Sequence, residues 1–303
     1  MKIGISFPTL ELHDPEEVKE FAQGAEQLGF HHMTALEHTL GVRTSASYTP
    51  DVHIHEPMVL FAFLAGVTRT IQFANSILIL PQRQTVVVAR QAAEVDALSG
   101  GRLRLGIGLG SNEEEAIGLG TDFHTRGARV EEQIEVMRML WTQDVVNFEG
   151  RWHHIIDGGL MVLPVQRPIP IWIGGGHGRR PLERIGRLAD GWVAGSSAQG
   201  DAEGQLETIR NASVAAGRPR DAVQVQGRMP LVGGGAEEWA LAAERWRELD
   251  ATHLAVNTSR GGFTTAAEHL TLAERFMDEV GKDLANWPRT PSRRERPPAA
   301  PPR

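Results

Sequence analysis

Short apolar runs alternate with longer segments of helical period along most of this chain. The runs predict eight strands, at Lys2–Phe7, His32–Ala35, Ile71–Ile79, Leu103–Leu109, Pro170–Gly174, Gly191–Ala194, Val223–Met229 and His253–Val256. The segments between them predict helices at Pro15–Leu28, Gln84–Leu98, Arg126–Trp141, Pro181–Ala189, Ala202–Ala216, Ala236–Leu249 and Thr265–Val280. Near-continuous apolar strands that alternate with helices are typical of a parallel sheet covered by helices.

The number of strand–helix units favours a closed barrel over an open sheet. Eight units in one unbroken series close naturally into a (β/α)8 TIM barrel, which takes roughly 250 residues, and this chain has 303. A doubly wound open sheet of the same strands is the alternative at this point. We therefore predict an α/β chain in which residues 1–285 form a single barrel domain.

Two stretches interrupt the alternation and a third follows it. Residues 39–56 form a long irregular loop after the second strand, at the end of a barrel where active sites are built. Residues 144–166 are interpreted as a hairpin insertion, because two β-rich runs flank Glu149-Gly150. Residues 286–303 are rich in Pro and Arg, which predicts a disordered tail.

Composition and charge narrow the classes of function. The net charge of -7 is spread without a basic stripe, which argues against nucleic acid or an anionic membrane as a partner. The chain has no cysteine, which excludes disulfides, thiolate catalysis and cysteine-based metal centres. No signal-peptide core precedes the first strand, and no apolar run reaches the ~20 residues of a membrane span. We therefore expect a soluble, cytoplasmic protein.

Two of the predicted strands run directly into glycine-rich turns. Gly106–Gly110 ends the fourth strand and Gly174–Gly178 follows the fifth, each ahead of a helical segment. Neither turn has glycine at the first, third and sixth positions, so the usual dinucleotide fingerprint is absent. Arg179-Arg180 follows the second turn, which favours a phosphate site there. The first turn fits a phosphate site and close packing inside the barrel equally well.

Histidines and carboxylates supply the other candidate chemistry. Pairs at His31/His32, His53/His55 and His153/His154 invite a metal interpretation, but no His-Glu-x-x-His helix holds them, so we predict no metal site. Glu37-His38 follows the second strand, at the end where barrel catalytic groups gather. A carboxylate beside an imidazole can move a proton near neutral pH. The alternative is a loop pair that only bonds to backbone.

The residues that carry a family resemblance are spread over most of the chain. They are Leu98–Arg102 leading into Leu105–Gly110, then Phe123, Arg126-Gly127, Arg129, Glu132, Leu140-Trp141, Pro164, Arg167–Gly175 and Ala189–Trp192. Together they resemble the bacterial luciferase-like superfamily of flavin- and deazaflavin-dependent oxidoreductases, up to about residue 280. The spacing is most similar to the branch that uses coenzyme F420.

This resemblance implies a cofactor site in the mouth of the barrel. The tricyclic ring would lie against a bulge after the third strand, which falls at Ser76-Ile77 and often carries a non-proline cis peptide in the family. Glu37 and His38 would be the catalytic residues beside the ring, although many deazaflavin enzymes have aspartate in place of Glu37. The end of the fourth strand and the phosphate cradle would add Leu109, Gly110, Ser111, Gly174, Gly175, Gly176 and His177.

The function that the resemblance implies is a coenzyme F420-dependent oxidoreductase, which transfers a hydride between a small organic substrate and the deazaflavin. The alternative keeps the fold and binds FMN, as a two-component monooxygenase that uses reduced flavin and oxygen. A barrel that holds a ligand without turnover is a third interpretation. Residues 39–56 and the hairpin near Trp152 are expected to determine specificity, and the family implies a homodimer.

Overall fold

The computed structural model describes residues 1–286 except 177 and 196–200, and these residues form the predicted barrel. The strands of the ring are β1 (Lys2–Ser6), β2 (His32–Ala35), β3 (Gln72–Asn75), β4 (Leu78–Ile79), β5 (Leu103–Gly108), β8 (Ile171–Gly174), β9 (Gly191–Val193), β10 (Gln224–Pro230) and β11 (His253–Asn257). Their order is β3-β2-β1-β11-β10-β9-β8-β5-β4, and β3 also pairs with β5, which closes the ring. The pairings described around this ring are all parallel.

The third position of the barrel is occupied by two strand segments, β3 and β4. Ala74 pairs with Arg104 and Leu78 with Ile107, so the β3–β4 side has one more residue than β5 over the same stretch. An extra residue on one strand is a bulge, which bends the strand and redirects its side chains. The bulge lies where the family resemblance predicts it.

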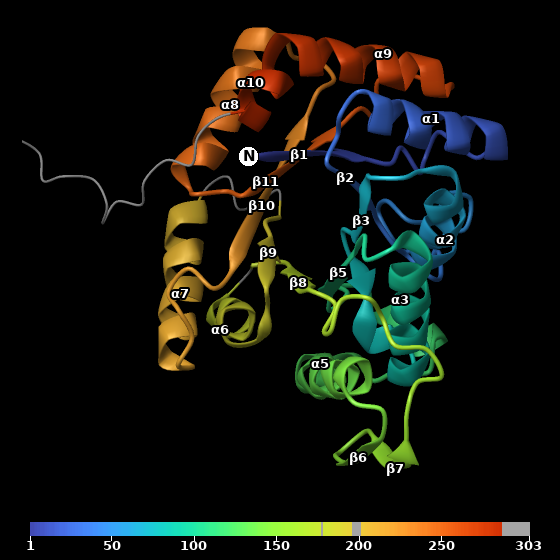
Figure 1. The fold of residues 1–303 in the computed structure, drawn as a ribbon, viewed down its shortest axis with the longest axis vertical. Helices are drawn as coiled ribbons and strands as arrows, with labels where there is room; N and C mark the ends of the chain where they lie inside the picture. The colour runs from blue at the N-terminus through green and yellow to red at the C-terminus, as the bar shows by residue number, and fades with distance from the viewer. Residues whose placement is uncertain (177, 196–200, 287–303) are drawn as a thin grey trace, which may run out of the picture.

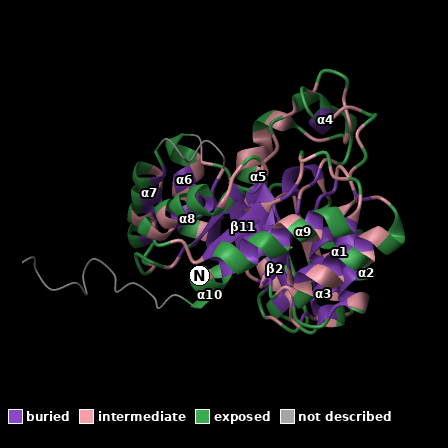
Figure 2. Ribbon diagram, turned by 90° about the horizontal axis from the view of Figure 1, so that it is seen from above, coloured by how far each residue is buried: buried purple, intermediate pink, exposed green. Residues whose placement is uncertain are grey.

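A layer of helices surrounds the barrel (Figure 1). The helices are α1 (Pro15–Gln27), α2 (Pro57–Val67), α3 (Thr85–Ser99), α5 (Arg126–Thr142), α6 (Arg179–Leu188), α7 (Ala202–Ala215), α8 (Ala236–Glu248) and α9 (Ala266–Phe276), with shorter ones at α4 (Glu113–Gly118) and α10 (Lys282–Asn286). Figure 2 shows the buried residues concentrated in the strands and on the helix faces that cover them, with α4 standing away from the ring.

Local signals explain where several of these helices begin and end. Asp14 caps α1 by accepting a hydrogen bond from the Glu16 backbone N–H at 2.9 Å. Thr265 and Glu268 form a capping box at the start of α9. Gly100 ends α3 with a φ of 72°, a left-handed conformation that favours glycine. The predicted helices are confirmed, with boundaries that shift by a few residues.

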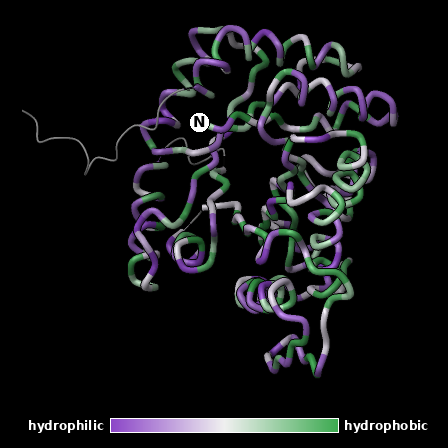
Figure 3. Tube along the Cα trace, in the orientation of Figure 1, coloured by the Kyte–Doolittle hydropathy of each residue, from purple (hydrophilic) through white to green (hydrophobic). Residues whose placement is uncertain are grey.

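One long helix of the outer layer, α2, is not predicted by the amphipathic pattern. Its sequence is apolar nearly throughout (Figure 3), and even its outer face carries Val59 and Phe63, which are 65% and 44% exposed. A helix with no polar face has no 3.6-residue alternation to detect. The pattern therefore cannot reveal α2, because the segment is apolar on all of its faces.

The two predicted insertions have different structures. Residues 39–56 contain neither helix nor strand. The second insertion holds an antiparallel pair, β6 (Val146–Glu149) and β7 (His154–Gly158), at the lower edge of Figure 1. Residues 287–303 of the predicted tail lie outside the described part of the chain, and Asn286 ends α10.

Polar side chains fill the part of the barrel interior near the starts of the strands. Arg104 on β5 is 6% exposed, lies over the ring of Trp172, and donates to Gln226 Oε1 at 2.6 Å. His32 and His253 lie beside it, with ring centroids 5.3 Å apart. Neither ring nitrogen of His32 has a hydrogen-bond partner among the described residues. A buried arginine therefore shares this space with two buried imidazoles.

We expect the free energy of unfolding to fall as the pH drops below about 6.5, because these histidines stay neutral in the fold. Burial, followed by Arg104, lowers the pKa of His253 to about 2, and the same two causes lower the pKa of His32 well below its ordinary value. The unfolded chain takes up these protons near pH 6.5 and the folded chain does not. Stability is therefore complete above that pH and is lost below it, by roughly 1.4 kcal/mol per pH unit for each histidine.

Urea unfolding between about pH 7.5 and pH 5 measures this slope. The range stays above the usual carboxylate pKa values, so the titration of acidic residues contributes little. His253→Gln should reduce the slope by roughly 1.4 kcal/mol per pH unit. His154→Gln is the matched control, because His154 is exposed on the hairpin, and its slope should equal that of the wild type. Equal slopes for all three proteins would contradict the assignment.

Candidate active site

The predicted site residues gather around the bulge at the carboxyl ends of the strands. Glu37 follows β2, and its carboxylate accepts a hydrogen bond from the backbone N–H of Ile79 on β4. The backbone N–H of Ser76 donates to the carbonyl of Ala35 on β2 at 2.7 Å. Carboxyl ends of parallel barrel strands share one face, which is where barrel active sites are built. Residues from separate strands thus meet at one end of the barrel.

Glu37 is buried and its carboxylate is fully engaged. It is 3% exposed and pairs with the Arg83 guanidinium, while Thr39 Oγ1 donates to its Oε1 at 3.2 Å. With the Ile79 N–H, three donors converge on its two oxygens. This carboxylate therefore ties the segment after β2 to β4 and to the loop that follows it.

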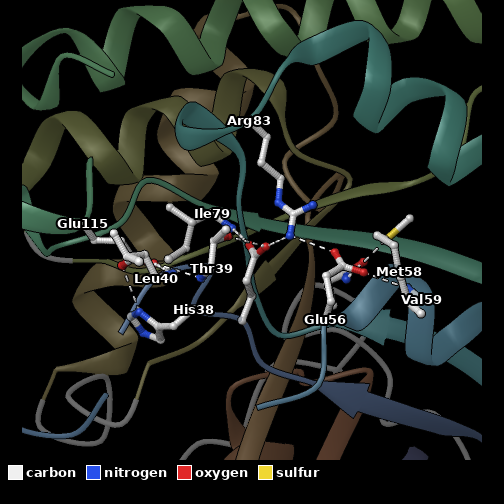
Figure 4. A network of polar contacts seen from close by, with 11 residues as sticks. His38, Thr39, Leu40, Glu56, Met58, Val59, Ile79, Arg83 and Glu115 are labelled. Atoms are coloured by element: carbon white, nitrogen blue, oxygen red, sulfur yellow. Dashed lines mark hydrogen bonds and ion pairs between the residues drawn. The ribbon is translucent and has the colours of Figure 1, made fainter. Parts of the chain in front are cut away.

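Arg83 links Glu37 to the start of α2. Its Nη2 also contacts Glu56 Oε1 at 2.8 Å, and Glu56 Oε2 accepts from the Val59 N–H at 2.7 Å, which caps α2 (Figure 4). Burial lowers the pKa of Arg83 and raises the pKa of Glu56. The network fixes the far end of the 39–56 loop close to Glu37.

His38 turns to a different partner from its neighbour Glu37. Its Nδ1 lies 3.0 Å from Glu115 Oε2, and its ring stacks on Tyr48 with centroids 3.8 Å apart. Figure 4 shows His38 and Glu115 pointing toward one another, with Thr39 and Leu40 beside them. Because Nδ1 is held by the carboxylate, the other ring nitrogen, Nε2, is left to exchange a proton with a ligand.

Glu115 on α4 is built to remain ionised opposite His38. It is 1% exposed, and its Oε1 accepts from the backbone N–H groups of Thr39 and Leu40 at 2.9 and 3.2 Å. Burial acts to raise the pKa of Glu115, but the hydrogen bonds from His38, Leu40 and Thr39 outweigh it and lower that pKa. A charged carboxylate is thereby aimed at one nitrogen of the imidazole.

The Ser76-Ile77 peptide bond is cis, as the family resemblance implies. The side chain of Ile77 covers two glycines, because a Cβ on Gly108 or Gly174 would lie 2.4 or 2.5 Å from its carbons. A Cβ on Gly106 would lie 1.9 Å from the carbonyl oxygen of Asn75. Close packing, one of the two interpretations of the Gly106–Gly110 turn, therefore accounts for Gly106 and Gly108.

The other residue of the bulge, Ser76, is held from across the barrel. Arg228 on β10 donates from Nη2 to the Ser76 carbonyl at 2.9 Å and also contacts Ser76 Oγ. Burial lowers the pKa of Arg228, an effect that the nearby Tyr48 opposes. The Arg228 guanidinium thus supports the bulge from the opposite side of the barrel mouth.

The second glycine turn leads into α6 and leaves its backbone accessible. Gly175 has a φ of +112°, and a Cβ there would meet no atom within 4 Å among the described residues. The N-cap of α6, Gly178, offers no side chain to the first N–H groups of the helix. A cavity of about 760 Å³ lies beside the turn, lined in part by Gly176 and Arg179. Exposed N–H groups at a helix start suit an anion.

The other predicted cofactor residues differ in their burial and in their distance from the bulge. Gly110 lies against Ile79, since a Cβ on it would be 2.8 Å from Ile79 Cγ2. Leu109 is half-buried and Ser111 is exposed, between β5 and α4. His177 lies outside the described residues. The end of β5 therefore borders the same bulge as Glu37.

Four residues of the site are missed by reasoning from the sequence alone. They are Glu56, Arg83, Glu115 and Arg228, which come from four separate parts of the chain. Glu115 carried one usable signal, because it sits among the acids of the segment after β5. The others have no motif, and only the closed barrel brings them to Glu37, His38 and Ser76.

The chain is similar to known proteins over most of its length. Residues 1–293 match the family described as luciferase-like monooxygenase. The F420-dependent glucose-6-phosphate dehydrogenase of Amycolatopsis mediterranei is 32% identical over 200 residues, which is 65% of this chain and 58% of that protein. The chain thus spans a little over half of the length of this relative.

Two solved structures share the fold at low sequence identity. The coenzyme F420-dependent tetrahydromethanopterin reductase of Methanopyrus kandleri has a TM-score of 0.75 at 16% identity, and covers 93% of this chain and 99% of its own. The monooxygenase RslO1 of Streptomyces bottropensis has a TM-score of 0.73 at 21% identity with the same coverage. At such identities the likeness establishes the barrel architecture alone.

Proposed function

Because the chain belongs to the luciferase-like monooxygenase family, we propose that it is a coenzyme F420-dependent oxidoreductase that transfers a hydride between a small organic substrate and the deazaflavin. The observation that carries the proposal is the contact between Glu115 and His38, the residue after Glu37, whose carboxylate accepts from the Ile79 N–H on β4. The similarity to an F420-dependent dehydrogenase supports the choice of cofactor.

The residues around the bulge fit a flat ring with a phosphate-bearing tail. Ile77 and the residues that follow β5, namely Leu109, Gly110 and Ser111, would border the ring. Gly174, Gly175 and Gly176, with the start of α6, would bind the phosphate, because this backbone is accessible and its first N–H groups have no side-chain cap. When bound, the deazaflavin supplies a carbon centre that accepts or donates the hydride.

His38 would handle the proton that accompanies hydride transfer. Oxidation of an alcohol to a carbonyl releases a proton from oxygen as the hydride leaves carbon, and the reverse reaction needs that proton back. His38 can accept or return it at Nε2 while Glu115 stabilises the charged imidazole through Nδ1. General acid–base catalysis of this kind contributes about 10²–10⁴-fold to a rate.

Glu37 takes the role of a positioning residue within this proposal. Its oxygens already accept from Ile79, Arg83 and Thr39, so it has little capacity left for a substrate proton. The bonds hold β4, and with it the bulge, in register with the segment that carries His38. Glu37 and His38 are neighbours in the sequence and were expected to be a catalytic pair, whereas we propose a separate task for each.

A second candidate function is an FMN-dependent monooxygenase. The monooxygenase RslO1 has the same fold at nearly the same TM-score as the F420-dependent reductase. The bulge and the phosphate cradle suit an isoalloxazine ring as well as a deazaflavin. The two functions differ in their co-substrate, because only the second consumes oxygen.

Titration of the purified protein with each cofactor tests the proposal. Quenching of cofactor fluorescence should give at least ~10-fold tighter binding of coenzyme F420 than of FMN, a difference of about 1.4 kcal/mol. Riboflavin lacks the phosphate and separates ring binding from phosphate binding, so it should bind more weakly than FMN. Tight binding of FMN with none of coenzyme F420 would overturn the proposal in favour of the monooxygenase.

We also propose how the chain assembles and where it is located. No helix in the described part of the chain is long and apolar enough to cross a membrane. We propose a cytoplasmic homodimer whose subunits pack through α2 and α3. These helices lie together and expose apolar side chains, namely Val59, Phe63, Val86 and Val87.

A further inference from the structure

Three histidines converge at the carboxyl end of the barrel, apart from the residues assigned above. His13 lies in the loop after β1, and His53 and His55 lie in the 39–56 loop after β2. One ring nitrogen from each can be chosen so that the three atoms all lie within 4.8 Å of one another. His53 and His55 are a close pair in the sequence, whereas His13 lies about 40 positions earlier and only the fold brings it to them.

His55 is already oriented in the way that a metal ligand requires. Its Nε2 lies 3.1 Å from the carbonyl oxygen of Leu12, and its backbone N–H donates to Thr9 Oγ1 at 3.2 Å. A carbonyl that accepts from one ring nitrogen fixes the tautomer and leaves the other nitrogen as the ligand atom. Nδ1 of His55 is thereby available to a metal.

The other two imidazoles would have to leave their stacked arrangement to bind one ion. His13 and His53 are stacked with centroids 4.0 Å apart and planes at 1°. Ligand nitrogens at about 2.0–2.1 Å from a tetrahedral zinc ion lie about 3.4 Å from one another. Because His53 is exposed, rotation of its side chain can bring the three nitrogens to that spacing.

We propose that His13, His53 and His55 bind one Zn²⁺ ion and leave its fourth position open to water or to a donor atom of a ligand. Three imidazoles suit zinc, nickel and copper, whereas magnesium and calcium prefer the oxygen ligands that this cluster lacks.

The proposed ion would strengthen the link between two loops that now meet through the His55 hydrogen bonds and the stacked rings of His13 and His53. His13 belongs to the segment between β1 and α1, and its partners belong to the loop in which we expect substrate specificity. A bound ion would therefore restrain residues 39–56, which also supply Tyr48 to the His38 ring. This site is independent of the proposed cofactor, because it shares no residue with the cofactor cradle.

Zinc titration of the whole protein, after dialysis against EDTA, tests the site without cofactor or substrate. Competition with a chromophoric chelator should report one tight Zn²⁺ per chain in the wild type. His53→Ala should weaken that binding by about 100-fold, since one ligand is lost. His154→Ala is the matched control, because His154 is also exposed but lies on the hairpin, and its affinity should equal that of the wild type.

Cobalt spectra and amide exchange test the proposed site in two further ways. Co²⁺ in place of zinc should give the visible bands of a tetrahedral site in the wild type and lose them in His53→Ala. Zinc should also slow amide exchange within residues 39–56 of the wild type. Equal affinity for zinc in His53→Ala and the wild type, or no tight binding by either, would overturn the proposal, with both proteins checked for native circular dichroism.

Discussion

Replacing His38 with asparagine is expected to lower kcat by about 10²–10⁴-fold while the dissociation constant of the cofactor stays nearly unchanged. His38 is the group at the site whose free nitrogen can exchange a proton, because Glu115 holds Nδ1. Asparagine keeps a polar side chain of similar reach at this position but cannot take up a proton. The loss should therefore fall on the chemical step and leave binding intact.

Steady-state kinetics with the preferred cofactor, together with the fluorescence titration, separates these two effects. Glu115→Gln should give a smaller loss of kcat, because His38 itself is retained while the neutral amide no longer stabilises a charged imidazole. His38→Ala should recover part of its activity on addition of imidazole, which can enter the space beside Tyr48. His154→Asn is the surface control. Full activity in His38→Asn would remove His38 from the mechanism.

The architecture could be predicted from the sequence because its signals are local. Most strands of the ring contain a short apolar run, although β10 includes Gln224, Gln226 and Arg228. Several helices have a polar face and a cap such as Asp14 or Thr265. α2 fails this test because it is apolar nearly throughout, although Glu56 caps its first turn and Pro57 stands at its first position. The local pattern predicts a helix where one face of the helix is polar, and it fails where every face is apolar.

The candidate site could be predicted only in outline because its contacts are not local. Glu37 and His38 are neighbours in the chain, yet their partners Arg83 and Glu115 lie 46 and 77 positions away. A strand end predicts that the pair reaches the barrel mouth but not which way each side chain turns. The same limit hid the approach of His13 to His53, which depends on two loops meeting.

Replacing Glu37 with glutamine is expected to lower the free energy of unfolding by about 3 kcal/mol. The carboxylate of Glu37 accepts from Ile79, Arg83 and Thr39, whereas glutamine offers one acceptor oxygen and places an amide donor against other donors. This loss lies near the lower end of the range for a broken buried ion pair, because Glu56 still contacts Arg83 in the variant.

Urea unfolding followed by tryptophan fluorescence measures the loss, and two further variants assign its cause. Glu56→Gln should cost only about 1 kcal/mol, since that carboxylate is one-third exposed. Adding Arg83→Met to Glu37→Gln should restore part of the stability, because the unpaired charge is then removed, with a coupling of about 1–3 kcal/mol. If Glu37→Gln were instead as stable as the wild type but inactive, the carboxylate would exchange protons during turnover. Stability and turnover together thus distinguish a residue that positions the bulge from one that takes part in the reaction.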